Sequence, residues 1–391
     1  MNKKLAVFNY YPLEFMGGGE QLAISLFNEL VSDYDITYYS PVEEKVVSRI
    51  SEDHLRRTLF FDYRKCAFQD FSIVRDRRLY KPFPSMEIIN REEVLLIFLS
   101  SPVPRRFLKG LINKGKRAIF LLHGITVERV SLSSVSLLKI SLFRFWVKWN
   151  LLVNHKYYAY DRFEYQVLNP SQLRLLENVG VNKTRITLIP NGLEFSDYQV
   201  GAASDKFRIV FIGRMEKVIK GVDLLISTAA EVIKTNLDVE FQVIGSGSYE
   251  SVVEDMSQQQ YSQFKYYAYV TQETKKAILA DASLMIVTSR TEPFSLSILE
   301  GLASGLPIVS TDCSGPRSII DSDELFGCIT SHKVSDFKSR IMDYYSVWRS
   351  DRDAYFAQKM ERRYRAEKLF NKGKMTTSYR LLVARLFSGG V

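Results

Sequence analysis

Short apolar runs recur along the chain and are separated by stretches with helical spacing. The runs predict buried strands, and the clearest ones cover residues 5–10, 94–99, 118–122, 208–212, 240–244 and 284–287. Between them, the spacing of apolar residues predicts amphipathic helices, as at 21–31 and 222–233. Strands that alternate with helices form parallel sheets. The pattern therefore predicts an α/β protein.

The most informative unit begins at residue 284. A loop with Glu292 follows its first strand, and a helix with Glu300 follows the loop. Gly305 stops that helix and Pro307 comes next, which is the usual punctuation of a helix end. The helix dipole and the free N–H groups at the helix start favour an anion. These groups belong to Phe294, Ser295, Leu296 and Ser297. The two carboxylates could accept hydrogen bonds from sugar and ribose hydroxyls.

Two further stretches carry basic or histidine side chains at the end of a predicted strand. Arg214 and Lys220 flank the loop after the strand at 208–212. Arginine offers a planar fork of donors and lysine a point charge, so the pair is suited to a diphosphate. His123 follows the strand at 118–122, at the end where open α/β sheets bind ligands. An ordinary structural histidine is the alternative interpretation.

A glycine loop follows the first predicted strand. Gly17 and Gly18 lie between that strand and the helix at 21–31. A backbone without side chains can approach a phosphate at such a position. A tight turn alone would also account for the two glycines.

Taken together, these motifs resemble those of retaining nucleotide-sugar glycosyltransferases of the family 4 type, also called glycosyltransferase group 1. The family's E-x7-E motif is matched by Glu292 to Glu300, and its G-R…K-G motif by Gly213 to Gly221. Its N-terminal G-G-x-E loop is matched from Gly17 to Glu20, and its Pro-Asn-Gly turn at residues 190–192. Ser295 is a departure, because the family often has glycine there.

The resemblance implies the GT-B fold, in which two doubly wound Rossmann-like domains face a cleft. Residues 1–198 would form the acceptor-binding domain and residues 199–371 the nucleotide-sugar-binding domain. A C-terminal helix within residues 372–391 would cross back onto the first domain. The composition is compatible with two domains, since 391 residues with 46% hydrophobic side chains can bury two cores.

The family's reaction moves a sugar from a nucleotide diphosphate to an acceptor hydroxyl and retains the anomeric configuration. The resemblance gives catalytic roles to His123, Arg214, Lys220 and Glu292. It gives donor-binding roles to Gly17, Gly18, Arg214, Lys220, Tyr269, Val270, Glu292, Phe294, Ser295, Leu296 and Glu300. In this scheme Glu292 holds the donor sugar, Glu300 holds the ribose, and Tyr269 and Val270 lie against the nucleobase. No cofactor and no metal ion are expected, because no D-x-D motif lies in a suitable loop.

Basic residues are concentrated in one part of the chain, whose formal net charge is +9. Residues 105–162 contain 12 Lys and Arg against 2 Asp and Glu. Phe143, Phe145, Trp146 and Trp149 lie in the same stretch. Basic and aromatic residues together are typical of a surface that meets anionic lipid. We therefore expect a lipid-linked or polysaccharide acceptor and an enzyme that is peripheral on the cytoplasmic face of a membrane.

Other interpretations fit parts of the sequence. The apolar residues of the basic stretch could belong to the core of the first domain, and a soluble anionic acceptor would also explain the charge. A sugar-nucleotide epimerase would share the fold, and a non-catalytic module could bind a membrane surface or nucleic acid. Arg214, Lys220 and the E-x7-E motif favour the transferase, for which no nucleic acid partner is expected.

The remaining features indicate a cytoplasmic protein. Three scattered cysteines are too few for a disulfide framework or a zinc site. No apolar run reaches the length of about 18 residues that suggests a membrane span. The apolar run near the start is predicted to be a strand, and not a signal peptide, because it is short and has no small-residue cleavage site.

Overall fold

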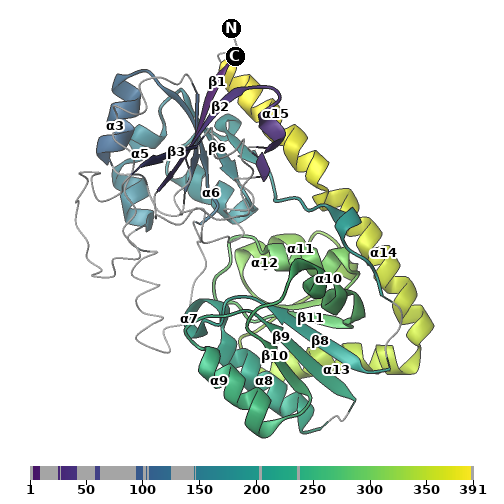
Figure 1. Ribbon diagram of the computed structural model, residues 1–391. Helices are drawn as coiled ribbons and strands as arrows, with labels where there is room; N and C mark the ends of the chain where they lie inside the picture. Colours follow the sequence, from purple (N-terminus) through teal and green to yellow (C-terminus); the bar gives the residue numbers. More distant parts are fainter. Residues whose placement is uncertain are drawn as a thin grey trace. The chain divides into compact units, whose positions relative to one another are not determined.

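The computed structural model describes residues 3–8, 25–26, 28–41, 58–61, 94–99, 103, 105–124, 145, 147–201, 205–235 and 238–388. The chain forms two compact units, and each is built on one parallel sheet (Figure 1). This architecture confirms the predicted α/β class with two Rossmann-like domains. The predicted glycine loop at Gly17 and Gly18 lies outside the described residues.

The first unit contains a seven-stranded sheet in the order β3-β2-β1-β4-β5-β6-β7, with parallel neighbours throughout. Its strands are β1 (Lys4–Phe8), β2 (Asp35–Pro41), β3 (Thr58–Phe61), β4 (Val94–Phe98), β5 (Arg117–Leu121), β6 (Phe163–Val167) and β7 (Ile186–Leu188). Its principal described helices are α3 (Arg105–Asn113), α5 (His155–Tyr158), α6 (Pro170–Asn178) and the later turns of α15 (Lys372–Phe387). Every residue of β4 is buried, as expected of a parallel strand that is covered on both faces.

The second unit contains a six-stranded parallel sheet in the order β10-β9-β8-β11-β12-β13. Its strands are β8 (Phe207–Ile212), β9 (Val239–Ile244), β10 (Phe264–Tyr267), β11 (Leu284–Val287), β12 (Ile308–Thr311) and β13 (Gly327–Thr330). Its α-helices are α7 (Lys217–Lys220), α8 (Val222–Ile233), α9 (Glu250–Asp255), α10 (Gln272–Asp281), α11 (Leu296–Ala303), α12 (Ser314–Ile320), α13 (Val334–Ser350) and α14 (Arg352–Phe370).

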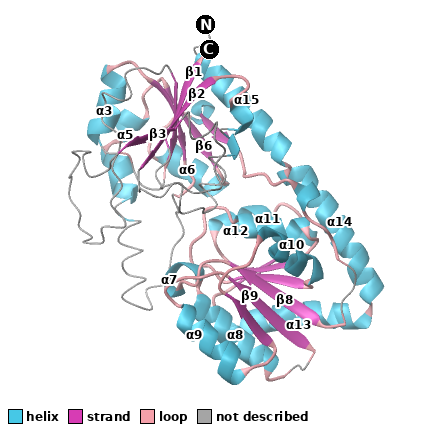
Figure 2. Ribbon diagram, in the orientation of Figure 1, coloured by secondary structure: helices cyan, strands magenta, loops and turns pink. Residues whose placement is uncertain are grey.

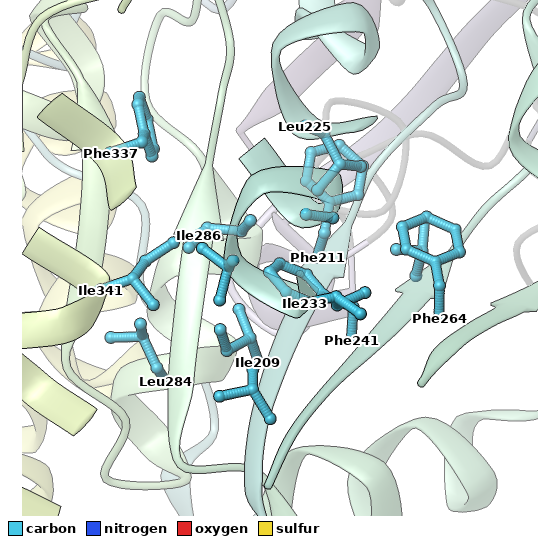
Figure 3. Close-up of a cluster of buried hydrophobic side chains, with 14 of the residues drawn as sticks. Ile209, Phe211, Leu225, Ile233, Phe241, Phe264, Leu284, Ile286, Phe337 and Ile341 are labelled. Atoms are coloured by element: carbon cyan, nitrogen blue, oxygen red, sulfur yellow. The ribbon is translucent and has the colours of Figure 1, made fainter. Parts of the chain in front are cut away.

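One face of this second sheet packs against α8 and α13, and α11 lies on the opposite face (Figure 2). Figure 3 shows the core on the α8 and α13 side, where side chains of β8, β9, β10 and β11 meet side chains of the two helices. The strands contribute Ile209, Phe211, Phe241 and Ile286. The two helices contribute Leu225, Phe337 and Ile341. The sheet is therefore a rigid base for the loops at its ends.

Helix α15 belongs to the first unit from Thr376 onward. Arg117 at the start of β5 donates from Nη1 to the carbonyl oxygens of Leu386 and Phe387, at 2.8 and 3.1 Å. Arg385 donates to the carboxylate of Glu164 in β6. These contacts confirm the predicted return of the C-terminal helix to the N-terminal domain. The division into two compact units passes from the first to the second between Ile189 and Pro190. The predicted domain boundary at residue 198 remains a prediction.

Candidate functional site

The predicted donor-binding residues of the second unit lie in the loops and the helices that follow the strands at the carboxyl edge of its sheet. Strands β8 and β11 are neighbours in that sheet, so the loops that follow them start side by side. Thr288, just after β11, donates to the carbonyl oxygen of Lys220 at 2.8 Å. The backbone N–H of Arg290 donates to the carbonyl oxygen of Ile219 at 2.8 Å. One hydrogen bond from the Thr288 hydroxyl and one backbone hydrogen bond thus join two stretches that lie far apart in the chain.

Two further features fix this junction. Arg290 forms a bidentate pair with Asp223 of α8, with both N–O distances at 2.8 Å. Gly221 has φ +63°, and a Cβ there would lie 2.1 Å from the carbonyl oxygen of Thr288. Only glycine combines the left-handed backbone with such a close approach. Asp223 and Arg290 were not identified from the sequence, because no local spacing signals an ion pair between residues so far apart.

The junction brings Lys220 and Glu292 into direct contact. The Nζ of Lys220 donates to Oε2 of Glu292, and both side chains are largely buried, with 19% and 12% exposed. An ammonium group has three N–H donors, so Lys220 can keep Glu292 and still reach an anion. The pair is electroneutral, which reduces the desolvation penalty that an unpaired buried charge would carry.

Arg214 has a different environment from Lys220. Its side chain is 63% exposed and pairs with Glu216, with an N–O distance of 2.7 Å. Glu216 is 25% exposed, so the pair is only partly in contact with water. A bound diphosphate would compete with Glu216 for the guanidinium, whereas Lys220 is already in place.

The start of α11 offers backbone donors next to this pair. Ser295 is the N-cap residue and makes no side-chain capping hydrogen bond, so the first N–H groups of the helix have no cap. Phe294 beside it is 2% exposed. Gly315 donates to the carbonyl oxygen of Glu292 at 3.1 Å, and a Cβ at Gly315 would lie 2.4 Å from the nitrogen of Phe294. This contact holds the segment tightly at the helix start.

Ser295 is the only non-glycine residue with positive φ among those that the structure describes, at +94°. A serine in this region carries backbone strain on the order of 1–3 kcal/mol. Its hydroxyl lies 3.1 Å from the hydroxyl of Ser297. In the sequence, this position stood out because the family that the chain resembles often has glycine where this chain has Ser295.

Glu300 in the second turn of α11 is held by two partners. Lys275 of α10 donates to Oε1 at 2.6 Å, and the hydroxyl of Tyr198 donates to the same oxygen at 3.1 Å. Burial, followed by the negative charge of Glu300, raises the pKa of Tyr198, so this phenol stays a donor. Both partners use Oε1, which leaves Oε2 available to ligand hydroxyls. Lys275 and Tyr198 were not identified from the sequence.

Tyr269 and Val270 follow β10 at the same edge of the sheet and precede α10, which carries Lys275. The side chain of Tyr269 is 71% exposed. The structure therefore places the basic, acidic and aromatic residues predicted for donor binding on the loops and helices that follow the strands at one end of one sheet. Within the described residues, no group of three or more His, Cys, Asp or Glu is arranged to hold a metal ion, and metal independence stays a prediction.

His123 lies in the first unit, directly after β5. Its Nε2 is 3.0 Å from Oε1 of Gln166 and 3.3 Å from the hydroxyl of Tyr379. Gln166 donates its amide to the carbonyl oxygen of Ile189 at 2.7 Å, which assigns Oε1 to the side of the histidine. Nε2 then carries the proton, and Nδ1 is the acceptor of the ring. Burial lowers the pKa of His123 to about 4, so the imidazole is neutral at neutral pH.

We expect His123 to titrate near pH 4 in the folded protein, against about 6.5 in an unfolded chain. The unfolded chain then binds a proton that the folded protein rejects as the pH falls from about 6.5 to 4, so this residue lowers stability on acidification. Proton NMR of the imidazole C2–H, assigned with His123→Gln, measures the midpoint. A midpoint close to 6.5 would show that burial does not control this ring.

We expect Ser295→Gly to raise the free energy of unfolding by about 1 kcal/mol, because relief of the positive-φ strain exceeds the added entropy of the unfolded chain. The matched control is Ser297→Gly, in the first turn of α11, where glycine should destabilise by about 0.5–1 kcal/mol. Urea denaturation of the three proteins measures both. Equal destabilisation by the two glycines would contradict the assignment of strain to Ser295.

Comparison with known proteins places this site in a family context. Residues 206–346 match the family model "Glycosyl transferases group 1". A phosphatidyl-myo-inositol mannosyltransferase of Propionibacterium freudenreichii is 29% identical over 153 residues, which are 37% of this chain and 37% of that protein. A poly(ribitol-phosphate) alpha-N-acetylglucosaminyltransferase of Staphylococcus aureus is 27% identical over 134 residues, which are 34% of this chain and 27% of that protein. The chain thus spans about a third of the length of these curated relatives.

Solved structures share the fold over nearly the whole chain. The crystal structure of Anabaena Alr3699/HepE in complex with UDP superposes with a TM-score of 0.71 at 14% sequence identity. The match covers 98% of this chain and 99% of that one. At this level of identity the likeness establishes the architecture of both units, and the chemistry must be argued from the residues.

Proposed function

The chain has the GT-B fold and carries a glycosyl transferases group 1 domain, and we propose that it transfers a sugar from a nucleotide diphosphate sugar to an acceptor hydroxyl with retention of configuration. The observation that carries this proposal is the cluster of Lys220, Glu292, Glu300 and the uncapped start of α11. All of these groups lie within the segment that matches the family. They supply the positive charge, the backbone donors and the hydroxyl acceptors that a nucleotide sugar requires.

The first chemical task is to stabilise the departing diphosphate. Lys220 is already positioned and keeps further N–H donors after it binds Glu292. The N–H groups at the start of α11 add a fixed dipole, and Arg214 joins when it leaves Glu216. Preorganised donors at developing negative charge are usually the largest single contribution to a rate enhancement. In this proposal these groups stabilise the leaving diphosphate without a metal ion.

The two glutamates have separate roles in this proposal. Glu292 contacts Lys220, so a donor sugar that hydrogen-bonds to Glu292 lies next to the leaving phosphate. Glu300 is held through Oε1 and offers Oε2 to the two ribose hydroxyls. Tyr269 and Val270, at the same edge of the sheet, would contact the nucleobase. Lys275 and Tyr198 act as positioning residues for the ribose acceptor.

His123 would orient the reacting sugar as a neutral group. Its protonated Nε2 is engaged by Gln166 and Tyr379, so Nδ1 is the atom that remains to accept from a sugar hydroxyl. A neutral imidazole cannot share a positive charge with the transition state. We assign no general base, and in this scheme the leaving phosphate takes the proton of the acceptor hydroxyl.

The names of the relatives and neighbours support a choice of donor and acceptor classes to test. UDP sugars are the first donors to test, because the HepE structure holds UDP. The two curated relatives are named for lipid-linked and polymer acceptors, phosphatidyl-myo-inositol and poly(ribitol-phosphate). We propose a glycan or lipid-linked precursor as the acceptor, and a peripheral location on the cytoplasmic face of a membrane. Mass-spectrometric detection of sugar transfer to such acceptors, with each nucleotide sugar in turn, tests the proposal and separates transfer from epimerisation.

We expect Lys220→Ala to lower kcat/KM by on the order of 10²–10³, because it removes a preorganised donor to the leaving diphosphate. Arg214→Ala should also lower kcat/KM sharply. The matched control is Lys217→Ala, which removes an exposed lysine from the same helix, α7. Near-wild-type turnover of both the Lys220 and the Arg214 variants would remove these residues from the diphosphate site.

The glutamate roles predict opposite effects on binding and turnover. Glu300→Ala should weaken binding of the bare nucleoside diphosphate by about tenfold to a hundredfold, since hydrogen bonds to a charged group contribute about 1.5–3 kcal/mol. It should also abolish the preference for the ribonucleotide over the 2′-deoxyribonucleotide. Glu292→Gln should impair transfer with little effect on bare nucleotide affinity. Calorimetry with both nucleotides decides the matter, and the reverse pattern would mean that the two roles are exchanged.

A further inference from the structure

The helical segment at 147–153 in the first unit has apolar residues on two sides. On the inner side, Val147 and Leu151 are 3% and 2% exposed and join the core together with Tyr158 of α5. On the outer side, large apolar side chains face solvent. Their exposed fractions are 66% for Phe145, 56% for Trp149, 50% for Leu152 and 52% for Val153.

These four exposed residues, which we call the outer stripe, form one surface. Phe145, Trp149 and Leu152 follow each other at spacings of four and three, which places them on one face of a helix. The rings of Phe145 and Trp149 stack with their centroids 6.3 Å apart. Single exposed apolar residues are ordinary, but a contiguous group marks an interaction site. The core interpretation therefore holds for the inner side of the segment and fails for the outer stripe.

A cluster of cations lies on α3 and α5, two helices that contact each other (Figure 1), and α5 follows the segment in the chain. Three positive groups surround the ring of Tyr157: Arg105 at 5.3 Å, Lys109 at 5.9 Å and Lys156 at 5.4 Å from its centroid. Arg105 also donates from Nε to the hydroxyl of Tyr157 at 3.0 Å. In the described part of the chain no carboxylate pairs with any of the three. We call these residues the Tyr157 cation cluster.

We propose that the outer stripe and the Tyr157 cation cluster together form a docking surface for an anionic phospholipid membrane. Phe145, Trp149, Leu152 and Val153 would enter the boundary between headgroups and acyl chains, and the three cations would bind lipid phosphates. Lys148, exposed on the same helical segment, adds a further positive charge. Among the described helices none is both long and apolar enough to cross a membrane. The inference rests on the proposed function in one respect, that the acceptor lies in the same membrane.

The chemistry of the surface selects this partner over others. A polyanion such as nucleic acid would meet the cations but leave the aliphatic side chains of Leu152 and Val153 in water. A second copy of the chain could cover the apolar stripe, but it would bring a second set of the same three cations close to the first, and like charges repel. An anionic bilayer satisfies both halves of the surface at once.

Flotation with lipid vesicles tests the proposal. The full chain should float with vesicles of phosphatidylcholine and phosphatidylglycerol at low salt, bind much less at high salt, and stay unbound with pure phosphatidylcholine. The fluorescence of Trp149 should shift to the blue on binding, and Trp149→Phe should lose most of that shift. If the wild-type chain stays in the soluble fraction with anionic vesicles at low salt, the proposal is wrong.

Matched variants separate the two halves of the surface. Lys109→Glu and Lys156→Glu should each lower vesicle binding well over tenfold, since each positive charge near such a surface contributes about fivefold and each reversal changes two charges. Lys183→Glu, an equal charge change at an exposed site of the same unit, should have a much smaller effect.

The double variant Trp149→Ser, Leu152→Ser should lose binding, whereas Leu381→Ser, at a residue that is 68% exposed on α15, should not. Equal effects of test and control variants would overturn the assignment of the surface.

Two further measurements distinguish failures. Thermal shift with UDP reports the nucleotide site in the second unit, and it should be unchanged in all of these variants. A chain that binds UDP but does not float contradicts the docking surface and leaves the proposed function intact, whereas floating without nucleotide binding contradicts the function alone. Retention on immobilised RNA without vesicle binding, or a dimer in light scattering that the Trp149 and Leu152 changes abolish, would each replace the membrane by another partner.

Discussion

The ion pair between Lys220 and Glu292 is the contact on which the candidate site depends. It joins the loop after β8 to the loop after β11, and these loops meet only because the two strands are parallel neighbours in one sheet. Ion pairs removed from water carry a large desolvation penalty and are retained where their surroundings fix them. Here the surroundings are the Arg290–Asp223 pair and the close approach of Gly221 to Thr288. Charge, backbone donors and hydroxyl acceptors are consequently held in place before any ligand arrives.

Much of this arrangement could be predicted from the sequence, because it depends on local order. Apolar runs marked the strands, and the position of Glu292, Glu300 and Lys220 relative to those runs placed them at one edge of a sheet. The contacts of Glu300 could not be predicted in this way. Tyr198 is 102 positions from Glu300 and Lys275 is 25 positions from it, and no periodicity relates side chains that meet only through tertiary packing.

The helical segment at 147–153 shows a different limit of sequence patterns. Apolar residues on two sides of a helical segment are compatible with burial, and the sequence alone left both core and surface open, with the surface favoured. Exposure depends on which other elements cover each face, and that is a property of the assembled unit. Val147 and Trp149 are two positions apart, yet one is 3% and the other 56% exposed. His123 is a similar case, since its neutral state follows from enclosure by residues distant in the chain.

The return of α15 to the first unit sets the order in which the units can be completed during synthesis on the ribosome. Arg117 in β5 finds its carbonyl acceptor in Leu386, which is synthesised 269 residues later. The second unit is nearly contiguous in the chain, from Pro190 to Met375, and can close while the first still lacks its last helix. Because domains generally fold as units while the chain emerges, the surface of the first unit that α15 will cover must stay soluble in that interval. The basic charges concentrated at residues 105–162 would oppose its self-association through mutual repulsion until α15 docks.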